Sequence, residues 1–332
     1  MKNGQLRFEF FLSRLETLLA KAARQKNPAL WLYQNDARTP LFMLEGLAKL
    51  YSGIHNKNKF EKLKAHFKLL EDTLGAIDYY DAFAKEFAAN KKIPKEVTAY
   101  MQAQSREKIQ SLNEILKEKK WLGEEGKRIK KTRKKLSKAN WLDEKEEIKC
   151  IEEFYISAIN KILEFINEKD FTFTDVENDV HEFRRKLRWL SIYPQALRGC
   201  IQLSKTKTAM PKFLSKYLTK EITGSKYNVM PDAGDQQVFL LLDKNRFYAL
   251  SWMIAELGSL KDNGLRAEAI KEALLQTSLK DEKTALARAY KIAGTGQLTI
   301  KQVIEKAQEL CRVYFKEKNL ETLIKGIAGI KK

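Results

Sequence analysis

The fold class is decided by the stretch Val180-His181-Glu182-Phe183-Arg184-Arg185-Lys186-Leu187-Arg188-Trp189-Leu190. With about 3.6 residues per helical turn, its apolar positions form one strip, which predicts a helix face that packs into a core. A second strip carries the basic side chains His181, Arg184, Arg185 and Arg188, at helical offsets of 0, 3, 4 and 7. Like charges at this spacing repel, so the strip is expected to be either fully solvated or covered by an anion.

Part of this pattern recurs near the start of the chain. Asn35-Asp36-Ala37-Arg38 repeats the form of His181-Glu182-Phe183-Arg184. The segment around Leu74-Gly75 likewise matches the one around Leu257-Gly258, and in each half the arginine-bearing helix comes first. This order indicates a duplicated helical unit.

These motifs resemble those of the CHAD family, the conserved-histidine α-helical domains. His181, Arg184 and Arg188 match the opening motif of the second repeat, and Leu257-Gly258 with Leu260, Lys261 and Asp262 matches the closing motif. The first copy departs from the pattern, because Asn35 and Phe42 stand where a histidine and a basic residue are expected. The resemblance implies an all-α, pseudo-twofold fold around a central basic cavity that binds inorganic polyphosphate.

The expected organisation is one helical domain over residues 1–332, with a first repeat at 25–140 and a second at 141–320. An insertion is expected near 204–234. Apolar spacing predicts helices over 5–24, 35–51 and 94–122, and a long helix or a broken pair over 57–89. After the acidic run that begins at Asp143, a helix is expected to about Glu168, followed by a central helix that Thr174-Asp175 caps and that ends before Pro194. A further helix is expected to carry Val238, Leu241 and Leu242, with shorter helices after it. No stretch alternates for long enough to predict a strand.

The charge balance favours a polyanionic partner. The chain has 62 Lys and Arg residues against 43 Asp and Glu residues, a formal net charge of +19. Residues 126–138 hold eight basic residues with no acid between them: Lys127, Arg128, Lys130, Lys131, Arg133, Lys134, Lys135 and Lys138. This segment is either a solvated arm or a wall of an anion site. The acidic run from Asp143 to Glu147 could mask part of it.

The sequence predicts no enzyme, metal or other cofactor, and His181 is the one residue that could act as an acid or a base. The three histidines have no metal-ligand spacing, and no phosphate-cradling loop or activated nucleophile is evident. The three scattered cysteines fit free thiols in a reducing cytoplasm. No apolar run approaches the roughly 20 residues that span a bilayer, so no membrane partner is expected.

We therefore predict a non-catalytic protein that binds polyphosphate, alone or in a granule. Arg184, Arg185 and Arg188 would form the floor of the site, His181 would orient a phosphate or a neighbouring arginine, and Arg38 would supply the pseudo-symmetric contact. The less certain walls are Lys62, Lys127, Arg128, Lys131, Arg133, Lys134 and Lys261. Two alternatives remain open: a nucleic-acid-binding helical protein, with Trp189 and Tyr193 as stacking platforms, and a structural relative of the family that has lost ligand binding.

Overall fold

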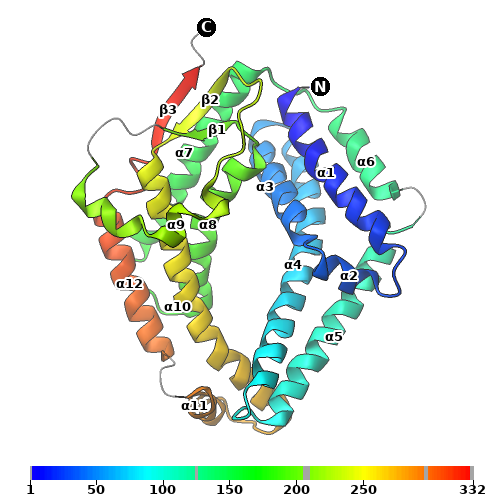
Figure 1. Ribbon diagram of the computed structural model, residues 1–332, viewed down its shortest axis with the longest axis vertical. Helices are drawn as coiled ribbons and strands as arrows, with labels where there is room; N and C mark the ends of the chain where they lie inside the picture. Colours follow the sequence, from blue (N-terminus) through cyan, green and yellow to red (C-terminus); the bar gives the residue numbers. More distant parts are fainter. Residues whose placement is uncertain (1, 124–125, 205–209, 295–297, 330–332) are drawn as a thin grey trace. The chain divides into compact units, whose positions relative to one another are not determined.

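The computed structural model describes residues 2–123, 126–204, 210–294 and 298–329 (Figure 1). This part of the chain is mostly helical, as predicted, with three short strands that were not predicted. The chain divides into two compact units, each assembled from segments that are distant in the sequence. Unit 1 comprises Met1–Arg7, Trp141–Asp262 and Ile300–Lys332, and unit 2 comprises Phe8–Asn140 and Asn263–Thr299.

Unit 2 consists almost wholly of antiparallel and crossing helices. Its helices are α1 (Asn3–Ala22) from Phe8 onward, α2 (Pro28–Gln34), α3 (Arg38–Ile54), α4 (Lys57–Ala89), α5 (Lys95–Glu118), α6 (Lys127–Leu136), the C-terminal part of α10 (Lys244–Thr277) and α11 (Glu282–Ala293). The long helix α4 packs against both α3 and α5, as Figure 1 shows. Buried apolar side chains of α4, including Phe60, Phe67 and Phe87, recur at helical spacing and fill this core.

Local sequence signals explain where these helices begin. The side chains of Asn27 and Asn56 accept hydrogen bonds from the backbone N–H of Leu30 (3.1 Å) and Lys59 (3.0 Å), and so cap α2 and α4. The helix predicted from residue 35 begins instead at Arg38. Asp36 adopts a left-handed conformation, with φ of 55°, that ends α2 and separates it from α3.

A second apolar cluster holds the far end of unit 2 together. Ala84 and Phe87 of α4, Met101 of α5 and Ile270 of α10 are buried in it together with residues of α11. At its edge Glu272 accepts hydrogen bonds from two tyrosine hydroxyls, each at 2.9 Å, from α4 and α5. These contacts join the end of α10 to the helical hairpin formed by α4 and α5.

Unit 1 combines helices with a small sheet. Its elements are α7 (Glu144–Glu168), a π-helical turn (Val176–His181), α8 (Glu182–Ala196), β1 (Ile201–Leu203), α9 (Lys220–Thr223), β2 (Val238–Leu242), the N-terminal part of α10, α12 (Ile300–Lys316) and β3 (Ile324–Gly329). The central strand β2 pairs in parallel with β1 and antiparallel with β3. The sheet packs on α7. The core surrounds Phe183 of α8, whose ring contacts Phe165, Phe173 and Phe315.

The prediction of a helix through Val238, Leu241 and Leu242 is wrong. These residues form β2, and α10 begins only at Lys244. A continuous apolar run of five residues suits a central strand as well as a buried helix, and the partner strands lie far away in the sequence. The strand β3 was not predicted either, because its partner β2 is distant in the sequence.

The predicted end of the central helix is also wrong, because α8 continues through Pro194 to Ala196. A proline removes the hydrogen bond to the carbonyl four residues earlier, which here belongs to Leu190. The buried hydroxyl of Tyr155 on α7 donates to this carbonyl instead. The predicted cap is confirmed, since the Asp175 side chain accepts from the backbone N–H of Asn178 at 2.6 Å.

Candidate anion-binding site

Arg184 on α8 is anchored beneath α10 in unit 1. Its Nε donates to the carbonyl oxygen of Ile254 at 3.1 Å. Its guanidinium lies against Gly258, where an added Cβ would stand 3.0 Å from Nε and 3.1 Å from one terminal nitrogen. The absence of a side chain at this position of α10 therefore makes room for the arginine head group.

The anchored guanidinium keeps most of its hydrogen-bonding capacity. Within the described part of the chain, the Ile254 carbonyl is the sole acceptor that Arg184 engages, so its two terminal amino groups carry no protein hydrogen bond. Burial lowers the pKa of Arg184, and the charge of Asp262 partly opposes this effect. A cation that is fixed in place and short of acceptors is suited to bind an anion through a bidentate contact.

The other cations predicted nearby have acidic neighbours. His181 Nδ1 lies 2.7 Å from a carboxylate oxygen of Glu177. This hydrogen bond is the main reason that the pKa of Glu177 is lowered, with Lys261 and Arg185 contributing. Arg185 forms an ion pair with Glu182, and Lys261 pairs with Asp262 at 3.1 Å. Arg188 lies half-buried on α8. The predicted residues of this half therefore gather around α8 and α10, with their charge partly neutralised.

Arg38 makes the corresponding contact within unit 2. Its guanidinium lies against Gly75 of α4, where an added Cβ would stand 2.7 Å from a terminal nitrogen. Its Nε donates to Glu71 at 2.6 Å, and Glu71, like Ile254 in unit 1, precedes the glycine by four residues. A second ion pair joins Arg38 to Asp78 at 3.4 Å. Two carboxylates thus neutralise Arg38.

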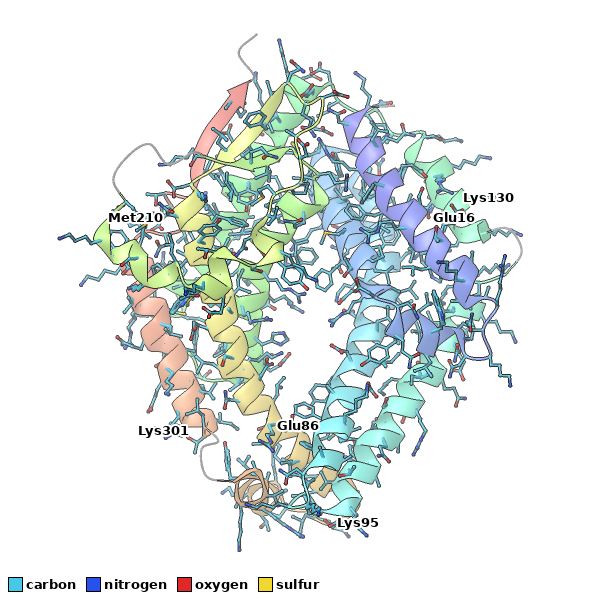
Figure 2. The ribbon with its side chains drawn as sticks, in the orientation of Figure 1. Glu16, Glu86, Lys95, Lys130, Met210 and Lys301 are labelled. Carbon is cyan, nitrogen blue, oxygen red and sulfur yellow. The ribbon has the colours of Figure 1, made fainter. Side chains whose placement is uncertain are left out.

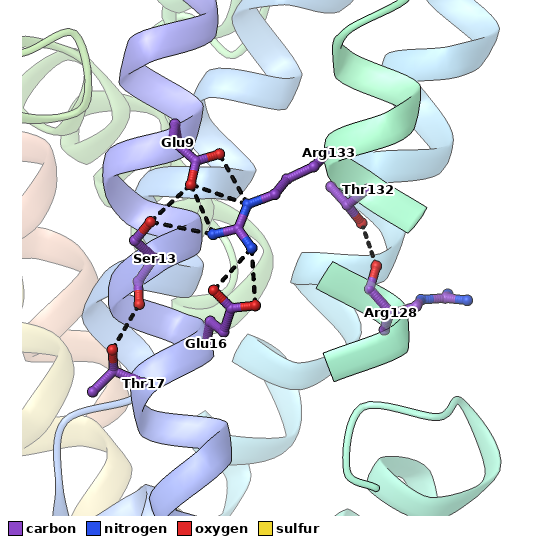
Figure 3. Close-up of polar contacts among 7 residues, drawn as sticks. All are labelled: Glu9, Ser13, Glu16, Thr17, Arg128, Thr132 and Arg133. Carbon is purple, nitrogen blue, oxygen red and sulfur yellow. Dashed lines mark hydrogen bonds and ion pairs between the residues drawn. The ribbon is translucent and has the colours of Figure 1, made fainter. Parts of the chain in front are cut away.

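One predicted wall residue, Arg133 of α6, is occupied by protein carboxylates. Figure 3 shows its guanidinium between two glutamates of α1, Glu9 and Glu16. The closest approaches are 2.7 Å and 2.8 Å, respectively. The hydrogen bond with Glu9 is the main cause that raises the pKa of Arg133. Arg133 therefore holds α6 against α1 and is not available to a ligand.

Another side of α6 remains strongly positive. Arg128 points away from α1 in Figure 3, and its guanidinium lies 5.5 Å from the centroid of the buried Trp121 ring. Lys62 and Lys131 are exposed, as are Lys127 and Lys134. The charges of Lys131, Arg128 and Lys62 reinforce burial in lowering the pKa of Lys135, so these groups lie near one another.

Two members of this group, Lys59 and His66 of α4, were not predicted from the sequence. Both lie within electrostatic reach of α6, because Lys59 acts on Lys135, and Arg128 acts on His66. The available signal was their spacing, since residues 59, 62 and 66 of α4 repeat the offsets of 128, 131 and 135 of α6. The acidic run that follows α6 has other partners. Glu147 pairs with buried Arg7, and Glu144 accepts from the backbone of Gln237 and Val238.

Comparisons with known proteins found no matching family model, no matching curated protein and no matching solved structure. The CHAD resemblance and the duplication at 25–140 and 141–320 stay predictions. Among the described helices, none combines the length and apolar character needed to cross a bilayer.

Proposed function

We propose that the protein binds inorganic polyphosphate, or a similar polyanion, without catalysing a reaction. The observation that carries this proposal is the state of Arg184, a half-buried guanidinium held by a backbone carbonyl, whose terminal amino groups have no acceptor among the described residues. The formal net charge of +19 adds long-range attraction for any polyanion.

The anchoring of Arg184 lowers the cost of binding. An exposed arginine loses rotamer freedom when it binds a phosphate, whereas Arg184 is already restricted by Ile254 and by packing against Gly258. Its two terminal amino groups match the geometry of two phosphate oxygens. Lys261 and Arg185, which lie in the same part of unit 1, would add point charges once a phosphate competes with their acidic neighbours.

We propose different roles for the two arginine–glycine contacts. Arg38 has the same relation to a helical glycine as Arg184, but Glu71 and Asp78 already supply its negative charge. We infer that the first copy has retained the architecture of the arginine–glycine contact without its ligand. The hypothesis of a structural relative thus applies to the Arg38 contact, while Arg184 keeps a binding role.

The test is a calorimetric titration of the full chain with inorganic tripolyphosphate. Replacing Arg184 and Arg188 together with alanine is expected to weaken binding at least roughly tenfold, because each charge-assisted hydrogen bond contributes about 1.5–3 kcal/mol. Circular dichroism should show unchanged helicity. The matched control is Arg106→Ala with Arg288→Ala, two exposed arginines of unit 2 that remove the same charge. Equal affinity for the double variant and the control would refute the assignment.

Nucleic acid is the competing ligand class. For a single strand, this hypothesis predicts aromatic or arginine side chains on the binding face, against which bases can stack. Of the two platforms considered, Tyr193 is buried, and Trp189 stacks against it with ring centroids 5.8 Å apart. A single-stranded RNA that displaces tripolyphosphate at physiological salt would favour the nucleic-acid hypothesis.

A further inference from the structure

We propose that unit 2 carries a second, self-contained site for a chain of phosphates, formed by neighbouring basic strips of α4 and α6. The α4 strip consists of Lys59, Lys62 and His66, and the α6 strip consists of Arg128, Lys131 and Lys135. We call this surface the α4–α6 basic face. It lies entirely within unit 2 and does not involve Arg184. The proposal rests on the proposed function for its ligand class, a polyphosphate, but the residues of the α4–α6 basic face differ from those around Arg184.

The two strips of the α4–α6 basic face are linked through the side chain of Trp121. Each strip has the offsets 0, 3 and 7, which place its three side chains along one side of a helix over roughly 10 Å. Trp121 joins the two helices, since its ring lies 6.3 Å from that of Phe67 on α4 and 5.5 Å from the Arg128 guanidinium on α6. Both rings are buried, so the strips rest on a packed apolar base.

Among the described residues, no acidic side chain forms an ion pair that would neutralise the positive charge of the α4–α6 basic face. Among them, no carboxylate forms an ion pair with Lys59, Lys62, Lys131 or Lys135. Arg128 has a ring, not an acid, beneath it. Elsewhere in unit 2 the cations do find acids, as Lys68 does with Asp72 at 2.5 Å. Gathering five cations without acids costs repulsion that a bound polyanion would relieve.

An inorganic phosphate chain needs only a row of cations, which the two strips supply over roughly 10 Å. Single-stranded nucleic acid binds in addition through exposed rings on which its bases stack. The aromatic ring at this place, Trp121, is buried and offers no stacking platform.

His66 makes binding at this face sensitive to protons. Burial, followed by the charges of Arg128, Lys135, Lys131 and Lys119, lowers the pKa of His66 to about 4. The imidazole is therefore neutral at pH 7. A bound phosphate chain cancels the neighbouring positive charges and restores the pKa toward its ordinary value, so binding near pH 5 should draw a proton from solution.

The test uses the full chain and inorganic tripolyphosphate. We expect Lys62→Gln, Lys131→Gln and Lys135→Gln together to weaken binding at this face at least roughly tenfold and to lower the salt dependence of binding by about two counterions. The matched control is Lys91→Gln, Lys92→Gln and Lys95→Gln, which removes the same charge from exposed residues of unit 2. Lys95 lies far from Lys130 of α6 in Figure 2.

Proton uptake identifies the face independently. Titrations at pH 5 in two buffers with different ionisation enthalpies should show uptake in the wild type and in the Arg184→Ala, Arg188→Ala variant, but not in His66→Gln. If the Arg184→Ala, Arg188→Ala variant loses binding and the lysine triple variant does not, the Arg184 site is supported and the α4–α6 basic face is overturned as a site. Equal losses in the lysine triple variant and its control would also overturn the second site. Equal displacement by a single-stranded oligonucleotide of matched charge would assign the face to nucleic acid and overturn the inorganic ligand.

Discussion

The guanidinium of Arg184 occupies the space that a side chain on Gly258 would fill. The glycine therefore acts as a positioning residue for the arginine. An added Cβ would meet only the flexible end of that side chain, at 3.0 Å, which can move away. The residue lies inside α10, where glycine is otherwise unfavourable.

Gly258→Ala should therefore separate stability from binding. The methyl group displaces the Arg184 guanidinium, while alanine is favoured over glycine in a helix by about 1 kcal/mol. We expect an unchanged or higher melting temperature together with weaker tripolyphosphate binding, as measured by differential scanning calorimetry and titration calorimetry. Gly75→Ala should leave affinity unchanged, because Arg38 is already neutralised by Glu71. Equal affinity for Gly258→Ala and the wild type would show that the contact does not position a binding group.

Tyr155→Phe should destabilise unit 1. The hydroxyl of Tyr155 satisfies the Leu190 carbonyl that Pro194 leaves without a helical donor. Loss of the hydroxyl leaves the buried Leu190 carbonyl without a donor, which should lower the free energy of unfolding by about 1–3 kcal/mol. Chemical denaturation measures the change. Adding Pro194→Ala restores the helical donor, so the double variant should regain part of the loss, and absence of any recovery would contradict this explanation of the proline.

The buried ion pair between Arg7 and Glu147 should respond differently to single and double replacement. Both side chains are almost inaccessible, at 4% and 3%, and their closest atoms lie 2.7 Å apart. Glu147→Leu leaves a buried cation without its carboxylate and should cost about 3–5 kcal/mol. Adding Arg7→Met should recover most of that loss, because an apolar pair of similar volume needs no desolvation. Urea denaturation of the three variants gives this comparison, and additive losses would contradict it.

The pH dependence of the free energy of unfolding should contain two opposite contributions, one from His66 and one from Glu45. Since burial lowers the pKa of His66 to about 4, the unfolded chain binds a proton below about pH 6.5 that the folded chain does not, so stability falls as the pH decreases. Burial raises the pKa of Glu45 to about 7, so the folded chain binds the extra proton between about pH 4.5 and 7, and stability falls as the pH increases.

Two variants separate these contributions. His66→Gln should reduce the loss of stability between pH 6.5 and 4, and Glu45→Gln should raise the melting temperature above pH 7. The pH-dependent effect of His66→Gln should be absent above about pH 7, and that of Glu45→Gln should be absent below about pH 4. Parallel pH profiles for the wild type and both variants would contradict the assignments.

Much of the helical architecture could be predicted because local signals determine it. The cap at Asp175, the proline in the first turn of α3 and the apolar period of α4 each act within a few residues. The strand at Val238–Leu242 could not be predicted, because its partners come from residues 201–203 and 324–329. The continuation of α8 through Pro194 likewise depends on Tyr155, a distant residue.

For the candidate site, the motifs put Arg184 and Gly258 in one half and Arg38 and Gly75 in the other, but the contact between each arginine and its glycine was not predicted. They could not show which arginine is neutralised, because Glu71 belongs to no recognised motif and Ile254 contributes only its backbone. The same limit applies to Arg133, whose partners on α1 lie more than 100 residues away.

The most direct test of the central claim compares Arg184→Gln with Arg38→Gln in the Lys62→Gln, Lys131→Gln, Lys135→Gln background, so that binding at the α4–α6 basic face does not mask the result. Tripolyphosphate affinity is measured by calorimetry at physiological salt. The account predicts a loss of at least roughly tenfold for Arg184→Gln and little change for Arg38→Gln. Equal affinities for the two variants, or a larger loss for Arg38→Gln, would contradict it.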